Sequence, residues 1–299
     1  MTTPGVVVLP AVPALGGLYA RGLAASARLA ALSRLGRASG TLPAVTYEAH
    51  GVIADADHLS AYQHLLGESA SDTLPAGFVH VLAFPVATAL MVRPDFPLPL
   101  AGMVHLANRV EQRRALGFGE RLDVRAHAES LRAHRSGTQV DLVTEVLVAD
   151  DVVWRGVSTY LAKGVRVAGD GGATDPAPRA PFVPPAPTGR WSLGGDVGRR
   201  YAAVSGDRNP IHLSPLTARA MGFPRAIAHG MYTASRALAA VGPARGEAFT
   251  WTVDFAKPVL LPGTVTVRVA PADDRPGFTC TGWNARSGTA HFTGAVVPG

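Results

Sequence analysis

The sequence predicts an α+β protein made of two similar halves, each with one long helix packed against a curled antiparallel sheet. Two observations predict it. A stretch rich in Gly, Pro and Asp, residues 168–188, divides the 299 residues into parts of similar length and reads as a linker. In each part, a helix-like segment precedes a run of strands with alternating polar and apolar residues, such as TVTVRV over 264–269. Helix and sheet would bury their apolar faces against each other.

The overall composition supports a folded protein and excludes several classes. Hydrophobic residues make up 47% of the chain and charged residues 17%, which is enough to build a core. The single cysteine, Cys280, excludes an internal disulfide framework and fits a reducing cytosol, so we expect a cytoplasmic protein. The net charge of +6 would serve solubility or attract an anionic handle such as the phosphates of coenzyme A. Nucleic acid is not expected, because the arginines are scattered and no binding motif accompanies them.

The first 40 residues form an extension that precedes the first half. Residues 6–31 are apolar, but Pro10, Pro13, Arg21 and Arg28 interrupt them, and no window reaches 18 uninterrupted apolar residues. A basic start typical of a signal peptide is missing. We therefore expect an amphipathic helix that docks on the protein, and no integral membrane segment.

The two halves, residues 41–167 and 189–299, share spacings that predict an internal duplication. The matching pairs are Tyr62 and Gly67 with Tyr201 and Gly206, and Pro75 and His80 with Pro224 and His229. Between these anchors the second half is longer, by a segment close to RNPIHLSPLT. Strands are expected in FTWTVDFAKPVLL, TVTVRVA, FTCTGWNA and GTAHFTGAVV, and in their first-half counterparts, with a tight turn at Asp150–Asp151.

The richest segment for chemistry is YAAVSGDRNPIHLS, residues 201–214. Gly206, Asn209 and Pro210 are turn formers, which predicts that Asp207 and His212 lie on an irregular loop after a helical turn. A carboxylate and an imidazole held together could share one water molecule and divide acid and base roles. The alternative is that Asp207 only caps the next turn and His212 is an ordinary loop residue. The segment is, however, the insertion that distinguishes the second half.

A helix is predicted to begin near residues 228–231, AHGM. Glycine at 230 allows close approach to the backbone, and the first helical N–H groups have no internal partner, so they could polarise a carbonyl oxygen. Alternatively, Gly230 only permits tight packing, and both roles are compatible. His229 fits a structural role at this helix start, since His80 holds the matching position. Met231 fits core packing.

Other chemistries lack their signatures. No metal-ligand spacing, dinucleotide fingerprint, Gly-rich phosphate loop or G-x-S-x-G elbow is present, so we expect no metal, nicotinamide or flavin. Arg208, Arg225 and Lys257 lie near the loop in sequence and could meet coenzyme A phosphates, or they are solvated surface charges.

These strings carry a family resemblance. YAAVSGDRNPIHLS, AIAHGMYTAS and FAKPVLLPG resemble the MaoC-like (R)-specific enoyl-CoA hydratases. With HVLAFPVATALM, GMVHLANRVEQRRALGFGERLDV and WRGVSTYL, the chain resembles the actinobacterial double-hotdog 3-hydroxyacyl-thioester dehydratases over residues 41–299.

The resemblance implies a double hotdog fold and a hydro-lyase without a cofactor. Asp207 and His212 match the catalytic pair, and the Gly230 amide matches the donor to the thioester carbonyl, with (3R)-3-hydroxyacyl thioesters as products of hydration. The residues expected to contact substrate are Asn209, Arg225, His229, Met231 and Lys257.

The first half keeps Gly67–Glu68 but lacks Asn-Pro-Ile-His, so we expect it to be non-catalytic. The substrate would be carried on coenzyme A or on an acyl carrier protein. The alternatives are an acyl-thioester binding protein without turnover, and a thioesterase. The sequence leaves open whether two chains pair as a homodimer.

Overall fold

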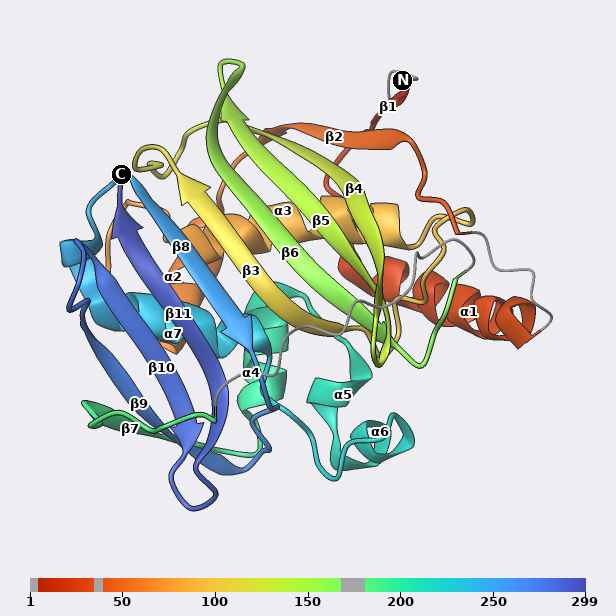
Figure 1. Cartoon of the computed structure of the whole chain (residues 1–299). Coiled ribbons are helices and arrows are strands. Elements are labelled where there is room, and N and C mark those ends of the chain that lie inside the picture. Colours follow the sequence, from red (N-terminus) through yellow and green to blue (C-terminus); the bar gives the residue numbers. More distant parts are fainter. Residues whose placement is uncertain (1–4, 35–39, 168–180) are drawn as a thin grey trace.

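The computed structural model describes residues 5–34, 40–167 and 181–299 (Figure 1). Most of the linker predicted over residues 168–188 lies outside the described residues, and residues 181–188 form no helix or strand. In the described part of the chain, no helix combines the length and the apolar character that crossing a bilayer requires.

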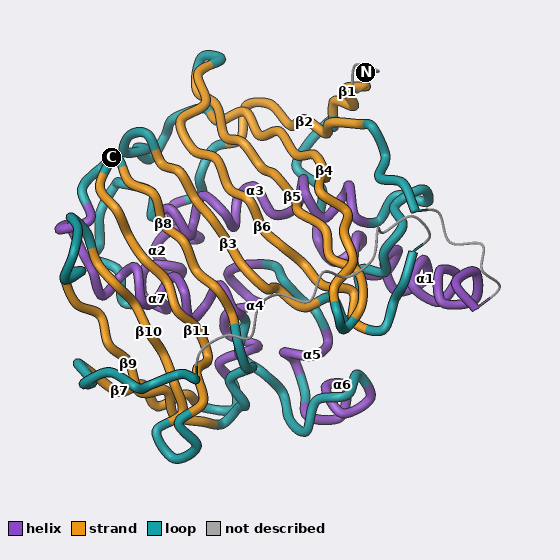
Figure 2. The backbone as a smooth tube through the Cα atoms, viewed as in Figure 1, coloured by secondary structure: helices purple, strands orange, loops and turns teal. Residues whose placement is uncertain are grey.

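One eleven-stranded sheet runs through the molecule in the order β1-β2-β4-β5-β6-β3-β8-β11-β10-β9-β7 (Figure 2). The first six strands in chain order are β1 (Gly5–Val8), β2 (Val45–Val52), β3 (Val104–Gln112), β4 (Leu122–His134), β5 (Gly137–Val148) and β6 (Asp151–Lys163). The others are β7 (Gly189–Leu193), β8 (Phe249–Phe255), β9 (Gly263–Pro271), β10 (Phe278–Asn284) and β11 (Thr289–Pro298). All neighbours are antiparallel except β1, which pairs parallel to β2.

The helices gather on one face of the sheet (Figure 1). They are α1 (Leu15–Arg34), α2 (Ala56–Leu66), α3 (Ala76–Met91), α4 (Val197–Ser205), α5 (Pro210–Leu213), α6 (Pro215–Ala220) and α7 (Gly230–Val241), with a 3₁₀ turn at Gly242–Arg245. Helix α3 packs on β2, β4, β5 and β6, and α7 packs on β9, β10 and β11. Each long helix is therefore covered by the strands of its own half.

The two halves repeat the same order of elements. A strand, a short helix, a long helix and four antiparallel strands occur as β2, α2, α3 and β3–β6, and again as β7, α4, α7 and β8–β11. The halves join where β3 pairs antiparallel to β8, with Asn108 opposite Val253. The predicted α+β arrangement, one long helix against a curled sheet in each half, is confirmed. The additional segment of the second half folds as α5 and α6.

Two local predictions have different outcomes. The predicted tight turn is present but lies one residue earlier, at Ala149–Asp150, which have positive φ of 50° and 71°, and Asp151 already begins β6. The strand expected through Leu261 ends earlier, at Phe255. Pro258 cannot donate to a ladder, and the segment Ala256–Val259 instead lines a cavity.

The spacing match between His80 and His229 does not mark equivalent positions. Helix α3 is capped by Pro75, so His80 lies one turn inside the helix. Helix α7 is capped by His229 itself. The common role at a helix start that the sequence suggested for both histidines is therefore wrong for His80. The glycine match is correct: Gly67 and Gly206 are the left-handed C-caps of α2 and α4.

Candidate active site

The segment with Asp207 begins where α4 ends. Gly206 caps this helix with a φ of 71°, a conformation that glycine adopts without steric cost. Asp207 follows directly, and its Oδ1 accepts a hydrogen bond of 3.0 Å from the backbone N–H of Asn209. Asn209 then caps α5, with Pro210 at its first turn. His212 consequently lies in a short helix, which corrects the prediction of an irregular loop.

The imidazole of His212 is buried and held in one tautomer. Its Nδ1 lies 2.8 Å from the carbonyl oxygen of Ile227. Because a carbonyl oxygen only accepts, Nδ1 carries the proton and Nε2 keeps a free lone pair. Burial, together with the neighbouring His229, lowers the pKa of His212 to about 3. The ring is therefore neutral at physiological pH, with Nε2 ready to accept a proton.

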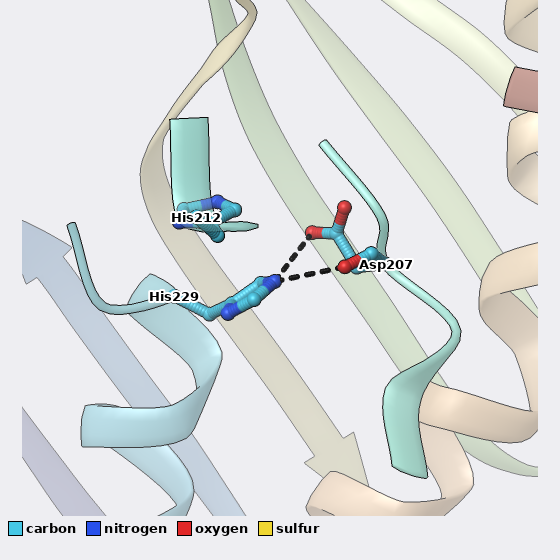
Figure 3. A group of neighbouring side chains, drawn as sticks. All are labelled: Asp207, His212 and His229. Atoms are coloured by element: carbon cyan, nitrogen blue, oxygen red, sulfur yellow. Dashed lines mark hydrogen bonds and ion pairs between the residues drawn. The ribbon is translucent and has the colours of Figure 1, made fainter. Parts of the chain in front are cut away.

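His229 lies against both members of the expected pair (Figure 3). Its ring stacks on that of His212, with centroids 3.7 Å apart and planes 25° from parallel. Its Nε2 lies 3.0 Å from the backbone oxygen of Asp207 and 3.8 Å from the carboxylate Oδ2. The hydrogen bond to the backbone fixes the proton on Nε2. His229 thus caps α7 and also forms one wall of the site, beyond the structural role considered from the sequence.

The carboxylate of Asp207 is half-buried and ionised. Burial raises its pKa, but the imidazoles of His229 and His212 and the hydrogen bonds from Tyr19 and the Asn209 amide outweigh this and hold the pKa below its usual value. Tyr19 comes from α1, far away in sequence, and its hydroxyl donates to Oδ1. The other carboxylate oxygen, Oδ2, is the one that lies 3.8 Å from Nε2 of His229.

The three side chains also supply atoms of the kind that bind metal ions. One such atom each from Asp207, His212 and His229 lies within 4.8 Å of the other two, although the sequence shows no metal-ligand spacing. Nδ1 of His212 and Nε2 of His229 are, however, both hydrogen-bonded to backbone carbonyl oxygens. Nε2 of His212 and Oδ2 of Asp207 remain as acceptors of two side chains that line the same cavity, and a water molecule has the two donors that they require.

The first turn of α7 forms the next wall. Gly230 is its first residue, so the Gly230 N–H has no acceptor within the helix. A Cβ at this position would lie 2.9 Å from the ring of Phe255 on β8. Glycine therefore fits the tight packing against Phe255, as the alternative interpretation proposed, and its unpaired N–H is compatible with that role.

A cavity of about 140 Å³ opens between the halves and is lined by most of the predicted residues. Asn209, His229, Gly230 and Met231 lie in its wall, and exposed Lys257 lies at its rim. Asn209 also links the halves, because its Nδ2 donates to the Met103 carbonyl oxygen at 3.4 Å.

Arg225 does not line this cavity. Its exposed guanidinium donates to the carbonyl oxygen of Pro262 at 3.3 Å. Any contact between Arg225 and a substrate would thus have to be made outside the cavity.

Sequence reasoning gave no site role to several polar residues of the cavity wall, among them Tyr19, His80, His105 and Tyr160. His105 stacks on Tyr160 with centroids 4.5 Å apart, and burial lowers the pKa of His80 to about 4 and that of His105 to about 3. Only their residue types could have drawn attention to them, because each lies in an ordinary helix or strand.

Comparisons with known proteins identify the family of the chain. The family model described as "MaoC like domain" matches residues 194–299. The "3-hydroxyacyl-thioester dehydratase X" of Mycobacterium tuberculosis is 38% identical over 255 residues, 85% of this chain and 90% of that protein. A crystal structure of this relative, HtdX, has a TM-score of 0.75 at 35% identity and covers 85% of this chain and 99% of its own.

Two further comparisons concern a shorter relative and the fold. The "(R)-specific enoyl-CoA hydratase" of Aeromonas caviae is 36% identical over 88 residues, 27% of this chain and 66% of that protein. An M. tuberculosis protein whose structure is described as a double hotdog fold has a TM-score of 0.53 at 15% identity, covering 82% of this chain and 92% of its own. The predicted double hotdog is therefore confirmed, and the chain belongs to the MaoC-like dehydratase family.

Proposed function

We propose that this protein catalyses the reversible syn hydration of trans-2-enoyl thioesters to (3R)-3-hydroxyacyl thioesters, with Asp207 and His212 as catalytic residues. The observation that carries the proposal is that Asp207 and His212, whose Oδ2 and Nε2 remain as acceptors, line one cavity together with Gly230, whose N–H has no acceptor within α7. Family membership supports the reaction class, because relatives at this similarity are named dehydratase and hydratase.

The chemistry follows from the proton positions. Water donating to Oδ2 of Asp207 and to Nε2 of His212 keeps a lone pair for attack on C3. As the O–C3 bond forms, the π electrons of C2=C3 move toward the thioester carbonyl, where the Gly230 N–H and the α7 dipole stabilise the enolate oxygen. His212 takes a proton from the water and delivers it to C2 on the same face. Dehydration runs the same path backwards.

The two carriers remain alternatives within this proposal. Lys257 at the rim of the cavity could pair with a phosphate of coenzyme A or of an acyl carrier protein. A binding protein without turnover is disfavoured, because Asp207 and His212 are both present and are held in reactive protonation states. A thioesterase is disfavoured because the segment Asp207–His212 resembles the hydratase pattern, and the relatives are named dehydratase and hydratase.

The test is the loss of the enoyl-thioester absorbance with crotonyl-CoA and with a longer trans-2-enoyl-CoA, measured for the wild type and for His212→Ala. We expect turnover by the wild type with a (3R) product, and a loss of roughly 100-fold or more in the variant. The melting temperature of the variant checks that it remains folded. Release of free thiol instead of loss of the enoyl band would favour the thioesterase. A wild-type rate equal to that of His212→Ala would contradict the proposal.

A further inference from the structure

The carboxylate of Asp207 has two oxygens in different surroundings. Oδ1 accepts from the Asn209 amide at 3.0 Å and from the hydroxyl of Tyr19. A carboxylate oxygen has two lone-pair directions, so these two donors occupy Oδ1 completely. Oδ2 faces His229 at 3.8 Å and stays available. The side on which Asp207 can hold water is thus set by its partners at Oδ1.

Tyr19 belongs to the N-terminal extension, for which the sequence indicates no function. We propose that Tyr19 is a positioning residue of the active site, which fixes the Asp207 carboxylate with Oδ2 turned toward the water held by His212. The inference rests on the proposed function and extends it: α1 would be part of the catalytic machinery although it lies outside both repeated halves.

The packing of α1 holds Tyr19 in place. Leu18 is fully buried and Tyr19 is 9% exposed. The side chain of Leu15 covers Gly206 so closely that a Cβ on this glycine would overlap it, and a Cβ on Gly22 would lie 2.7 Å from Leu100. Helix α1 therefore touches the residue before Asp207 and also runs beside α3 (Figure 1).

Two further attachments anchor this segment. Strand β1 pairs with β2, with Val7 opposite Tyr47, and the hydroxyl of Ser26 accepts from the amide of Ala101 at 3.3 Å. The phenol of Tyr19 is consequently delivered to Oδ1 by a docked helix. The other ionisable side chains whose pKa the charge of Asp207 raises are His80, His105, Tyr160, Tyr201, His212 and His229.

The first experiment needs no substrate. Tyrosines labelled with ¹³C at Cζ give one NMR resonance for each of the six tyrosines, and Tyr19→Phe identifies that of Tyr19. A phenol that donates to a carboxylate carries more negative charge than one that donates to a neutral amide. We therefore expect Asp207→Asn to move the Tyr19 resonance upfield, further than any of the other five. An unmoved Tyr19 resonance would overturn the inference.

The second experiment separates positioning from packing. Tyr19→Phe keeps the ring and removes only the hydroxyl, and Tyr47→Phe is the matched control, since the Tyr47 hydroxyl accepts from Arg93 outside the cavity. With crotonyl-CoA we expect kcat of Tyr19→Phe to fall by roughly tenfold or more, the scale of one hydrogen bond to a charged group. KM should change by less than about threefold, because Tyr19 acts through Asp207 and not on the substrate.

Three kinetic outcomes would overturn the inference: a kcat of Tyr19→Phe equal to that of Tyr47→Phe, a change confined to KM, or faster turnover, which would mean that Tyr19 obstructs the site. Wild-type protein inactive on every enoyl thioester would contradict the proposed function instead. The NMR result would then still decide whether Tyr19 pairs with the Asp207 carboxylate.

Discussion

The two halves of the molecule place a carboxylate at equivalent backbone positions, but the neighbouring side chains differ and shift its pKa in opposite directions. Glu68 follows Gly67 at the end of α2, as Asp207 follows Gly206 at the end of α4. Glu68 Oε2 lies 3.5 Å from Arg245 Nη2, and both side chains are largely buried. Burial raises the pKa of Glu68 although Arg245 opposes it. The carboxylate of the first half is thus held by a guanidinium, and that of the second half faces two imidazoles.

This difference shows that the repeated fold provides the same backbone geometry in both halves, but that the side chains around the carboxylate are not repeated. The cap glycine presents a carboxylate in both halves, but only the second half adds α5, which carries His212 into reach. Both halves have a helix that ends in glycine followed by a carboxylate residue. Only in the second half does the inserted segment add a histidine, so only there can the two side chains hold a water molecule together. We infer from it that the first half is non-catalytic and serves to complete the sheet and the cavity.

The largest expected effect tests the comparison directly. Asp207→Asn should lower kcat by roughly 100-fold or more, because the amide is uncharged and presents a donor in place of one of the two carboxylate acceptors. Glu68→Gln should leave kcat within about twofold of the wild type, since Glu68 does not line the cavity. Steady-state rates with crotonyl-CoA measure both variants. A large loss in Glu68→Gln would restore a catalytic role to the first half.

A smaller effect is expected from the two cap glycines. Alanine at either position is strained by the positive φ, at a cost of about 1 kcal/mol of unfolding free energy. At Gly206 the new methyl group would also overlap Leu15 and displace α1, whereas at Gly67 no atom lies within 4 Å of it.

Gly206→Ala should therefore lower kcat several-fold, and Gly67→Ala should lower stability alone. Denaturant unfolding and kcat, measured on both variants, check the pair. Equal kcat values for the two variants would show that docking of α1 on Gly206 has no bearing on turnover.

The smallest effect concerns pH. The pKa of His212 is lowered to about 3, and those of His229 and Asp207 also lie below their usual values. His212 thus changes charge far below neutrality, so we expect kcat/KM to show no acid limb at the ordinary histidine pKa of about 6.5. An acid limb near pH 6.5 would contradict the neutral, buried imidazoles.

The free energy of unfolding should depend on pH in the range where kcat/KM does not. Below about pH 6.5 the histidines of the unfolded chain bind protons, whereas folded His212 does not do so until about pH 3. The unfolded state is thus favoured as pH falls through this window, by up to about 1.4 kcal/mol per pH unit for each such histidine. Thermal unfolding of the wild type from pH 7 to 5 should show the decline, and His212→Gln should show a shallower one.

The sequence by itself determined the two-part α+β architecture and the segment that carries the site. Alternating residues predict β9 and its neighbours because a strand places successive side chains on opposite faces. Gly206 and Pro210 mark helix ends through their own backbone preferences. These signals are local, so they can be recognised without knowing what packs nearby. They located Asp207 and His212, but not the helix that carries His212.

Only the tertiary structure decided which groups surround Asp207. Tyr19 and Asp207 are 188 residues apart in the chain, and neither the 20-residue helix around Tyr19 nor its composition indicates an active-site contact. The stacking of His229 on His212 likewise depends on how α5 and α7 meet. The pKa values of Glu68 and Asp207 shift in opposite directions because different side chains approach them from other elements, Arg245 in one case and His229 in the other. Such contacts arise from the fit of whole surfaces, and no local pattern in the chain records them.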